Sequence, residues 1–249
     1  MIWAIVLMCL ISPNLNLMNT DPVLDVRDVK FGYEKSETLI HLETLQIQRG
    51  ESVFLRGPSG SGKSTLLGLI GGVLRPHAGH ISICGTDITT LPSGRRDQIR
   101  ADHLGIIFQQ LNLLPYLNIV QNVTLPCRFS AARRTRASQT KSVLETAKQL
   151  VTDLGLKEDL LERNVGKLSI GQQQRVAVAR ALIGGPDLII ADEPTSALDS
   201  DNRDRFIELL DTHRKRFACS LLFVSHDLSL AKHFDTAIDL NTLNRAVRT

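Results

Sequence analysis

The chain has 249 residues, of which 43% are apolar and 22% charged, and its formal net charge is +3. These values describe an ordinary globular protein that is long enough to bury a core, as one α/β domain or two smaller ones. The charge is too small to argue by itself for a nucleic-acid partner.

The four cysteines, Cys9, Cys84, Cys127 and Cys219, are scattered along the chain without a C-x-x-C pair. Their spacing favours neither a zinc site nor a disulfide scaffold, and it suits a reducing cytoplasm.

Residues 1–11 are wholly apolar. The run is shorter than the about 20 residues that a membrane-spanning helix needs, and it lacks the basic start of a secretory signal. We interpret residues 1–20 as an apolar extension before the folded domain, and our leading hypothesis is that translation begins at Met18. The alternative is an interfacial membrane hook. N-terminal sequencing of the natural protein separates the two.

Short runs of alternating apolar residues predict strands at 23–26, 39–42 and 45–48. These strands would form a small antiparallel sheet. Tyr33 lies between the first two, and its ring is able to stack on an adenine ring. Ordinary packing within a strand is the alternative.

Residues 57–65 fit the pattern G-x-x-x-x-G-K-[ST] between a predicted strand at 52–55 and a predicted helix. Glycines allow successive backbone N–H groups to converge on phosphate oxygens at the positive end of a helix. The pattern predicts that Lys63 reaches the β- and γ-phosphates of a nucleotide and that the Ser64 hydroxyl reaches Mg²⁺. The predicted loop consists of Gly57, Pro58, Ser59, Gly60, Ser61, Gly62, Lys63, Ser64 and Thr65.

A strand and turn are predicted at 81–87, and a charged helix follows that contains Arg95, Asp97 and Arg100. Residues 104–108 then indicate a buried strand ending at Gln109. An amide at the end of such a strand is well placed to meet a metal ion or a water molecule.

Residues 111–183 have a helical composition. Apolar residues recur there at helical spacing, namely Val143, Leu144, Ala147, Leu150, Val151 and Leu154. A basic group precedes or begins this helix, consisting of Arg128, Arg133, Arg134, Arg136 and Lys141. The group is interpreted either as a solvated face or as a surface near lipid headgroups or a membrane partner.

Ser169 is a natural N-cap for the helix that follows it, and Gly171 adds a bare amide, so this helix start is able to hold an anion. A strand at 187–191 ends at Asp192 and Glu193. Two carboxylates at the end of a buried strand are costly unless a cation meets them. In a protein with a phosphate loop, Mg²⁺ is that cation.

A final apolar strand at 221–224 is followed by His226. Ligands of open α/β sheets bind outside the carboxyl ends of the strands. We therefore expect Gln109, Asp192, Glu193 and His226 to converge on the loop at 57–65.

Together, these motifs resemble the nucleotide-binding subunit of an ABC transporter over roughly residues 23–239. The matching elements are Tyr33 (aromatic loop), residues 57–65 (Walker A), Gln109 (Q-loop), residues 168–172 (signature), residues 188–193 (Walker B), Asp199 (D-loop) and His226 (switch histidine). The resemblance implies an α/β fold with a P-loop NTPase (RecA-like) core, an antiparallel β subdomain and an inserted α-helical subdomain at about 111–184. The whole domain would span residues 21–249.

The resemblance also implies an ATPase that uses ATP and Mg²⁺. Mg²⁺ would be held through Ser64, Gln109 and Asp192. Glu193 would polarise the attacking water, His226 would contact the γ-phosphate, and Lys63 would neutralise developing charge.

A head-to-tail dimer is implied as well. In that dimer, ATP on one copy's Walker A motif is covered by Ser169 and Gly171 of the other copy. Gln172 of the signature and Asp199 of the D-loop are also expected to bind the nucleotide. The other partner would be an integral membrane permease, so the chain would lie peripherally on the cytoplasmic face of the inner membrane. No nucleic acid is expected, although a soluble ABC ATPase acting on ribosomes or DNA is the alternative function.

Residues 69–72 and 108–115 resemble the lipoprotein-release, macrolide-export and cell-division branch, whose permeases carry large extracytoplasmic domains. The sequence departs from the common pattern in three places. Ile170 replaces a glycine of the signature, Gln121 replaces a frequent glutamate, and residues 239–241 replace the usual D-G-[RK].

Overall fold

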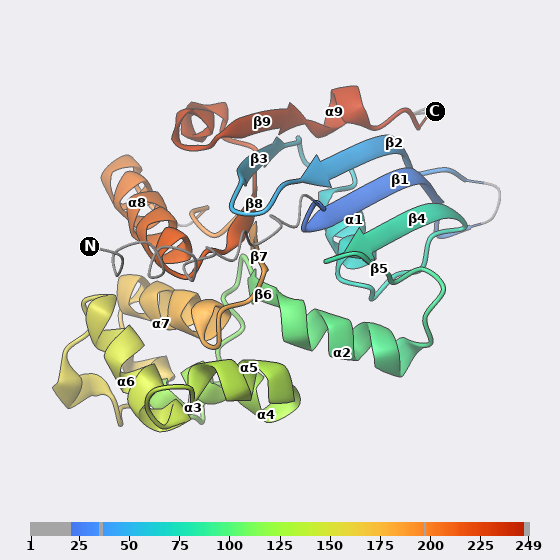
Figure 1. Ribbon diagram of the computed structural model, residues 1–249. Helices are drawn as coiled ribbons and strands as arrows, with labels where there is room; N and C mark the ends of the chain where they lie inside the picture. Colours follow the sequence, from blue (N-terminus) through green and yellow to red (C-terminus); the bar gives the residue numbers. More distant parts are fainter. Residues whose placement is uncertain (1–20, 35–36, 197, 247–249) are drawn as a thin grey trace, which may run out of the picture.

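The structure is a computed structural model that describes residues 21–34, 37–196 and 198–246. It contains a four-stranded antiparallel sheet, a five-stranded parallel sheet and a group of helices on the far side of the parallel sheet (Figure 1). The hypotheses on Met18 and on a membrane hook concern residues 1–20, which lie outside the described part.

The antiparallel sheet has the strand order β2-β1-β4-β5, and its strands are β1 (Leu24–Phe31), β2 (Ile40–Ile47), β4 (Ala78–Ile83) and β5 (Thr86–Asp87). The prediction of separate strands at 39–42 and 45–48 is wrong, because β2 is continuous. Its buried residues change phase at Glu43 and Thr44, both exposed, so the alternation breaks although the strand does not. The paired strand β1 changes phase at the same level, where Asp28 has a φ of 50°.

The parallel sheet has the order β6-β7-β8-β3-β9, built from β6 (Leu104–Ile107), β7 (Leu188–Asp192), β8 (Ser220–Ser225), β3 (Ser52–Arg56) and β9 (Thr236–Asp239). The strands predicted at 104–108, 187–191, 221–224 and 52–55 are confirmed as β6, β7, β8 and β3. The strand predicted at 221–224 is not the last one, since β9 follows it and pairs with β3. β9 has only four residues, none fully buried, and therefore lacks the apolar pattern of a core strand.

The parallel sheet separates two cores, because successive side chains of a strand point to opposite faces. Phe54 of β3 and Phe223 of β8 face the core shared with the helices. Val53 and Leu55 face the core shared with the antiparallel sheet and α1 (Lys63–Ile70). This burial on both faces fixes the strands whose carboxyl ends carry the polar residues of interest.

The helices between β6 and β7 are α3 (Ile119–Thr124), α4 (Pro126–Phe129), α5 (Ala131–Ala137), α6 (Val143–Asp153), η1 (Glu158–Leu160), η2 (Val165–Lys167) and α7 (Ile170–Leu182). Helix α2 (Ser93–His103) precedes β6, and α8 (Ser200–Arg216), η3 (Leu228–His233) and α9 (Leu240–Leu243) follow β7. We propose 111–184 as the extent of the helical subdomain. None of the described helices is both long and apolar enough to cross a membrane.

Two expectations about the helical region are corrected. Leu144 belongs to the predicted apolar face of α6, but it is 51% exposed in the first turn. Arg133 was grouped with basic surface residues, but it is buried. Its guanidinium donates to the carbonyls of Ala181 and Ile183 at 2.6 and 2.8 Å, so it satisfies the last carbonyls of α7.

Burial lowers the pKa of Arg133 to about 10. At neutral pH its guanidinium is still charged, so it is an internal helix cap rather than a solvated or lipid-facing group. Arg128, Arg134 and Lys141 are exposed, as the solvated-face interpretation expects.

Candidate functional site

The loop between β3 and α1 has a conformation that depends on glycine. Gly62 is the N-cap of α1 with a φ of 94°, a region that side chains disfavour, and a Cβ there would lie 2.8 Å from Cδ1 of Ile40. At Gly57 a Cβ would lie 2.4 Å from the Ser61 hydroxyl. That hydroxyl is buried and has no hydrogen-bond partner among the described residues. The loop thus presents an unpaired polar group beside the N-terminus of a helix, as a phosphate site requires.

Lys63 is held against this loop. Its ammonium group donates to the carbonyls of Gly57 and Pro58 at 2.6 and 3.1 Å and lies 3.1 Å from Oε1 of Glu193. The Lys63 and Glu193 side chains are only 11% and 14% exposed. An ion pair with so little water around it is stronger than one on an open surface.

Glu193 joins this lysine to a histidine. Its Oε2 lies 3.0 Å from Nδ1 of His226, which follows the neighbouring strand β8. Glu193 has a φ of 43°, an unfavourable value for a residue with a side chain, and its N–H donates to Val224 O at 2.9 Å. Positive φ values outside glycine recur at functional sites because surrounding contacts must enforce them. Lys63, Glu193 and His226 therefore form a continuous row of contacts across three segments of the chain.

Asp192 and Gln109 are two further polar residues of this site. Burial raises the pKa of Asp192, the adjacent Glu193 charge raises it further, and Lys63 opposes the shift. One pocket is lined by Leu39, Pro58, Ser59, Gly60, Gly62, Lys63, Ser64, Thr65, Gln109, Asp192, Glu193 and His226. The predicted convergence of the three strand ends on the phosphate loop is confirmed.

The same pocket suits a hard divalent cation. A hydroxyl, an amide and a carboxylate oxygen, from Ser64, Gln109 and Asp192, face it together. Mg²⁺ prefers oxygen ligands of this kind and keeps several waters. A cation would also offset the crowding of negative charge at Asp192.

Tyr33 lies at the margin of this site. Tyr33 is 67% exposed, and its ring lies nearly perpendicular to that of Phe31 with 5.3 Å between ring centroids, while its hydroxyl is 3.3 Å from the Thr65 hydroxyl. The exposed surface of Tyr33 is therefore available to a ligand. Leu39 lines the pocket but was not predicted as a site residue, because nothing distinguishes it in the sequence from other apolar strand residues.

The segment after Gln109 is held by an arginine that the sequence did not single out. Leu111 and Asn112 have φ values of 55° and 45°, and both carbonyls accept hydrogen bonds of 2.6 Å from the Arg180 guanidinium. Arg180 belongs to α7 and is buried, which lowers its pKa. Helix α7 thereby fixes the path of the chain beside Gln109.

The N-terminus of α7 lies at a different hollow. The Ser169 hydroxyl accepts from the Gln172 N–H at 3.3 Å, and the Gln172 side chain accepts from the Ser169 N–H at 3.0 Å, which is a capping box. Ser169, Gly171 and Asp199 line this second hollow together. None of the described residues lines both this hollow and the nucleotide pocket. The structure therefore separates the predicted site residues into two groups.

Asp199 is the N-cap of α8, where its carboxylate accepts from the Asn202 N–H at 2.9 Å. Ile170, which replaces a signature glycine, is 57% exposed, so the substitution leaves the fold of α7 unaffected. Gln174 connects the two groups, because its buried amide donates to Pro194 O, just after Glu193, at 3.2 Å.

Residues 41–196 match the family model described as ABC transporter. An uncharacterized ABC transporter ATP-binding protein of Mycobacterium tuberculosis is 37% identical over 228 residues, covering 90% of this chain and 88% of that protein. The macrolide export ATP-binding/permease protein MacB of Shigella flexneri is 37% identical over 222 residues. That match covers 88% of this chain but only 33% of MacB.

Among the solved structures that resemble the fold are two of the same ATP-binding cassette. One is a dimeric bacterial ABC transporter cassette, with a TM-score of 0.73 and 33% identity over 87% of this chain and 94% of that chain. The other is a dimeric ATP-binding cassette in a post-hydrolysis state with ADP and Pi, with a TM-score of 0.73 and 32% identity over 87% and 93% of the two chains.

Proposed function

This chain belongs to the ABC transporter family, and from that premise we propose which of its residues bind and hydrolyse ATP and how the cassette is completed. It is an ATP-binding and ATP-hydrolysing subunit of an ABC transporter complex, with the fold of a P-loop NTPase cassette. The observation that carries the residue assignments is the row of contacts from Lys63 through Glu193 to His226 beside a glycine-dependent loop.

Residues 57–65 are proposed to hold the phosphates of ATP, with Ser61 and Lys63 donating to their oxygens. Support comes from the buried, unpartnered Ser61 hydroxyl and from the N-terminus of α1. Tyr33 is proposed to stack on the adenine ring, with Leu39 as a neighbouring apolar wall. Ser64, Gln109 and Asp192 would hold Mg²⁺, which supplies positive charge to the phosphate oxygens when bound.

Glu193 is proposed to orient and polarise the attacking water. In the structure its carboxylate is shared between Lys63 and His226. Phosphate oxygens compete with Glu193 for the Lys63 ammonium, so nucleotide binding would release Glu193 to accept a hydrogen bond from water. His226, 62% exposed, would contact the γ-phosphate, and Lys63 would neutralise the charge that develops there.

The separation of the two hollows supports a head-to-tail dimer. Ser169, Gly171 and Asp199 lie outside the nucleotide pocket of their own chain, and Ser169 is exposed at the start of α7. In the proposed dimer these groups, with Gln172, cover ATP bound to the other copy. Two solved structures of one similar cassette are described as dimeric.

A permease is proposed to dock at a groove that lies between α2 and α4. Phe108 and Phe129 line it and are 39% and 69% exposed. Since Phe108 directly precedes Gln109, a helix seated in this groove would move with the nucleotide pocket. The chain would then lie peripherally on the cytoplasmic face of the inner membrane.

MacB contains an ATP-binding and a permease part in one protein, by its name, and this chain matches about a third of it. We propose that the permease partner carries a large extracytoplasmic domain, as in the branch that the sequence resembles. The relatives support transport rather than the alternative of a ribosome- or DNA-associated ATPase.

Purification of the tagged chain from gently solubilised membranes, with mass spectrometry of what accompanies it, tests this proposal. We expect an integral membrane protein to co-purify, and we expect Phe129→Asp to reduce its recovery strongly. Val73→Asp, a change at an apolar residue that is 67% exposed outside the groove, is the matched control. Recovery with ribosomes or DNA instead, or equal loss with both variants, would contradict the proposed docking.

A further inference from the structure

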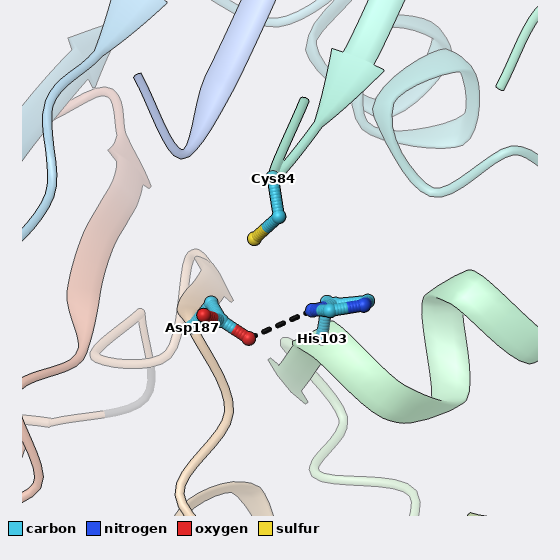
Figure 2. A group of neighbouring side chains, drawn as sticks. All are labelled: Cys84, His103 and Asp187. Atoms are coloured by element: carbon cyan, nitrogen blue, oxygen red, sulfur yellow. Dashed lines mark hydrogen bonds and ion pairs between the residues drawn. The ribbon is translucent and has the colours of Figure 1, made fainter. Parts of the chain in front are cut away.

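Three side chains with metal-binding chemistry meet at the end of the sheet opposite the nucleotide pocket. Cys84 lies in the turn between β4 and β5, His103 is the last residue of α2, and Asp187 directly precedes β7. One ligand atom from each lies within 4.8 Å of the other two. Figure 2 shows the sulfur, the ring nitrogen and the carboxylate oxygen pointing toward one another, with His103 Nδ1 and Asp187 Oδ2 2.8 Å apart.

The backbone holds these residues in place. The Cys84 N–H donates to Val23 O at 2.9 Å, and the Asp187 N–H donates to His103 O at 3.0 Å. The Asp187 carboxylate uses its two oxygens differently, since Oδ2 faces His103 while Oδ1 accepts from Arg49 at 3.2 Å. By holding Oδ1, Arg49 orients Oδ2 toward His103 and Cys84. Residues that hydrogen-bond to metal ligands orient them in the same way.

The donor set is typical of one class of cation. A thiolate, an imidazole and a carboxylate are the ligands that Zn²⁺ takes, at about 2.0–2.3 Å, and three protein ligands with a water are a common arrangement. The two anionic ligands would neutralise the dication. His103 and Asp187 side chains are each 27% exposed, and Cys84 is half-buried, so an ion and a water can reach the site.

We propose that Cys84, His103 and Asp187 form a binding site for a zinc-class transition-metal ion, separate from the nucleotide site. β7 begins next to Asp187 and ends at Asp192, and a strand of five residues is about 17 Å long. The oxygen donors at its far end suit Mg²⁺, whereas a set that includes sulfur and nitrogen selects softer metals. The two sites would therefore bind different ions.

The competing explanation is a structural ion pair between His103 and Asp187 with a thiol nearby by chance. The chain contains a useful comparison, because His80 Nδ1 and Asp87 Oδ2 form a similar pair at 3.0 Å. Among the described residues, Cys84 adds a third ligand within reach of the same ion to the His103–Asp187 pair, whereas no third ligand joins His80 and Asp87. The thiol is thus the feature that a test must isolate.

The role of the Cys84 thiol is tested by Co²⁺ titration of the full-length, nucleotide-free protein after its metals have been removed with EDTA. We expect the near-ultraviolet thiolate-to-cobalt band and the visible absorption of tetrahedral Co²⁺, and we expect Zn²⁺ to abolish both. Cys84→Gly should lose the thiolate band and bind at least about 10–100-fold more weakly. Glycine suits this position, because Cys84 has a φ of 49°.

Cys84→Gly keeps the other three cysteines, so a band from any of them would persist and would overturn the proposal. Cys127→Ala and His80→Gln are the controls and should leave the band unchanged. The absence of a thiolate band from the parent protein would also overturn it.

Thermal unfolding gives a second readout that does not depend on absorption. Zn²⁺ should raise the Tm of the parent protein, because an ion that binds only the folded state stabilises it, and the rise should be much smaller for Cys84→Gly, which binds the ion more weakly. An equal shift in both proteins would overturn the proposal even if Cys84→Gly folds less well.

Discussion

The two hollows differ in how much of their chemistry is satisfied within the chain. In the nucleotide pocket, Lys63 and His226 both contact Glu193, and Lys63 also binds two loop carbonyls. In the signature hollow, the side-chain contacts of Ser169 and Asp199 with other described residues are local, namely the bonds of helix N-caps and one bond from the Asn202 side chain to Asp199. The first region is assembled by one chain, whereas the second presents its groups outward. The difference supports a division of the site into a cradle and a lid supplied by separate copies.

The largest expected effect is at Glu193. Glu193→Gln should reduce ATP hydrolysis by about 10²–10⁴-fold, because the amide is a poor proton acceptor, while ATP binding is kept. In the presence of ATP, the Glu193→Gln protein should then accumulate as a dimer, which size-exclusion chromatography detects. Glu208→Gln, at an exposed residue of α8, should behave like the parent protein. Unchanged hydrolysis in Glu193→Gln would refute the assigned role.

The division between cradle and lid is tested by mixing chains. Lys63→Ala and Ser169→Ala should each be nearly inactive, and a mixture should regain hydrolysis, because a mixed head-to-tail dimer has one site with both parts intact. The measurement is ATPase activity after co-refolding or co-expression. If cradle and lid came from the same chain, mixing would restore nothing.

A smaller effect is expected on nucleotide affinity. Lys63→Ala should weaken ATP binding about 10–100-fold, since a hydrogen bond from a charged group contributes about 1.5–3 kcal/mol. Equilibrium binding of a fluorescent ATP analogue measures this, with Lys157→Ala, an exposed lysine, as control. Binding at parental strength would contradict the phosphate-loop assignment.

A substitution of Arg180 tests whether α7 stabilises the segment after Gln109. Arg180→Gln should cost about 1–3 kcal/mol in the free energy of unfolding, because two carbonyls in left-handed residues lose their donors. Urea unfolding measures the loss, and Arg134→Gln on the surface should cost far less. Equal losses of unfolding free energy in the two variants would show that the buried contacts of Arg180 contribute nothing to stability.

The smallest effect concerns the metal-free His103–Asp187 pair. Asp187, together with Cys84, raises the pKa of His103 to about 9. Because this value exceeds that of the unfolded chain, the stabilisation is complete below about pH 6.5 and is lost as the pH rises through about 9. In EDTA, His103→Gln should therefore lose on the order of 1 kcal/mol at pH 6 and less at pH 10. A loss that does not change with pH would contradict this.

Much of the nucleotide pocket could be predicted from the sequence because its chemistry is local. The glycine positions, Lys63 and the carboxylates at the end of β7 each belong to a short segment whose strand or helix context is visible in the residues themselves. The rule that ligands bind at the carboxyl ends of strands then predicted that Gln109 and His226 lie at the same pocket, as they do.

Other features lacked a local signal. β9 is short and partly exposed, and the phase change in β2 made one strand resemble two. Arg133 and Arg180 have the same residue type as surface arginines, and only the carbonyls that surround them explain their burial.

The sequence by itself determined the phosphate loop, the order of the motifs and the class of fold, because backbone geometry and charge act over a few residues. Only the tertiary structure decided that the signature lies apart from the nucleotide pocket and that Cys84 meets His103 and Asp187. The cysteine spacing argued against a zinc site, yet spacing reports only on ligands that are neighbours along the chain. Side chains from distant segments come together through the packing of two sheets, which no single segment encodes.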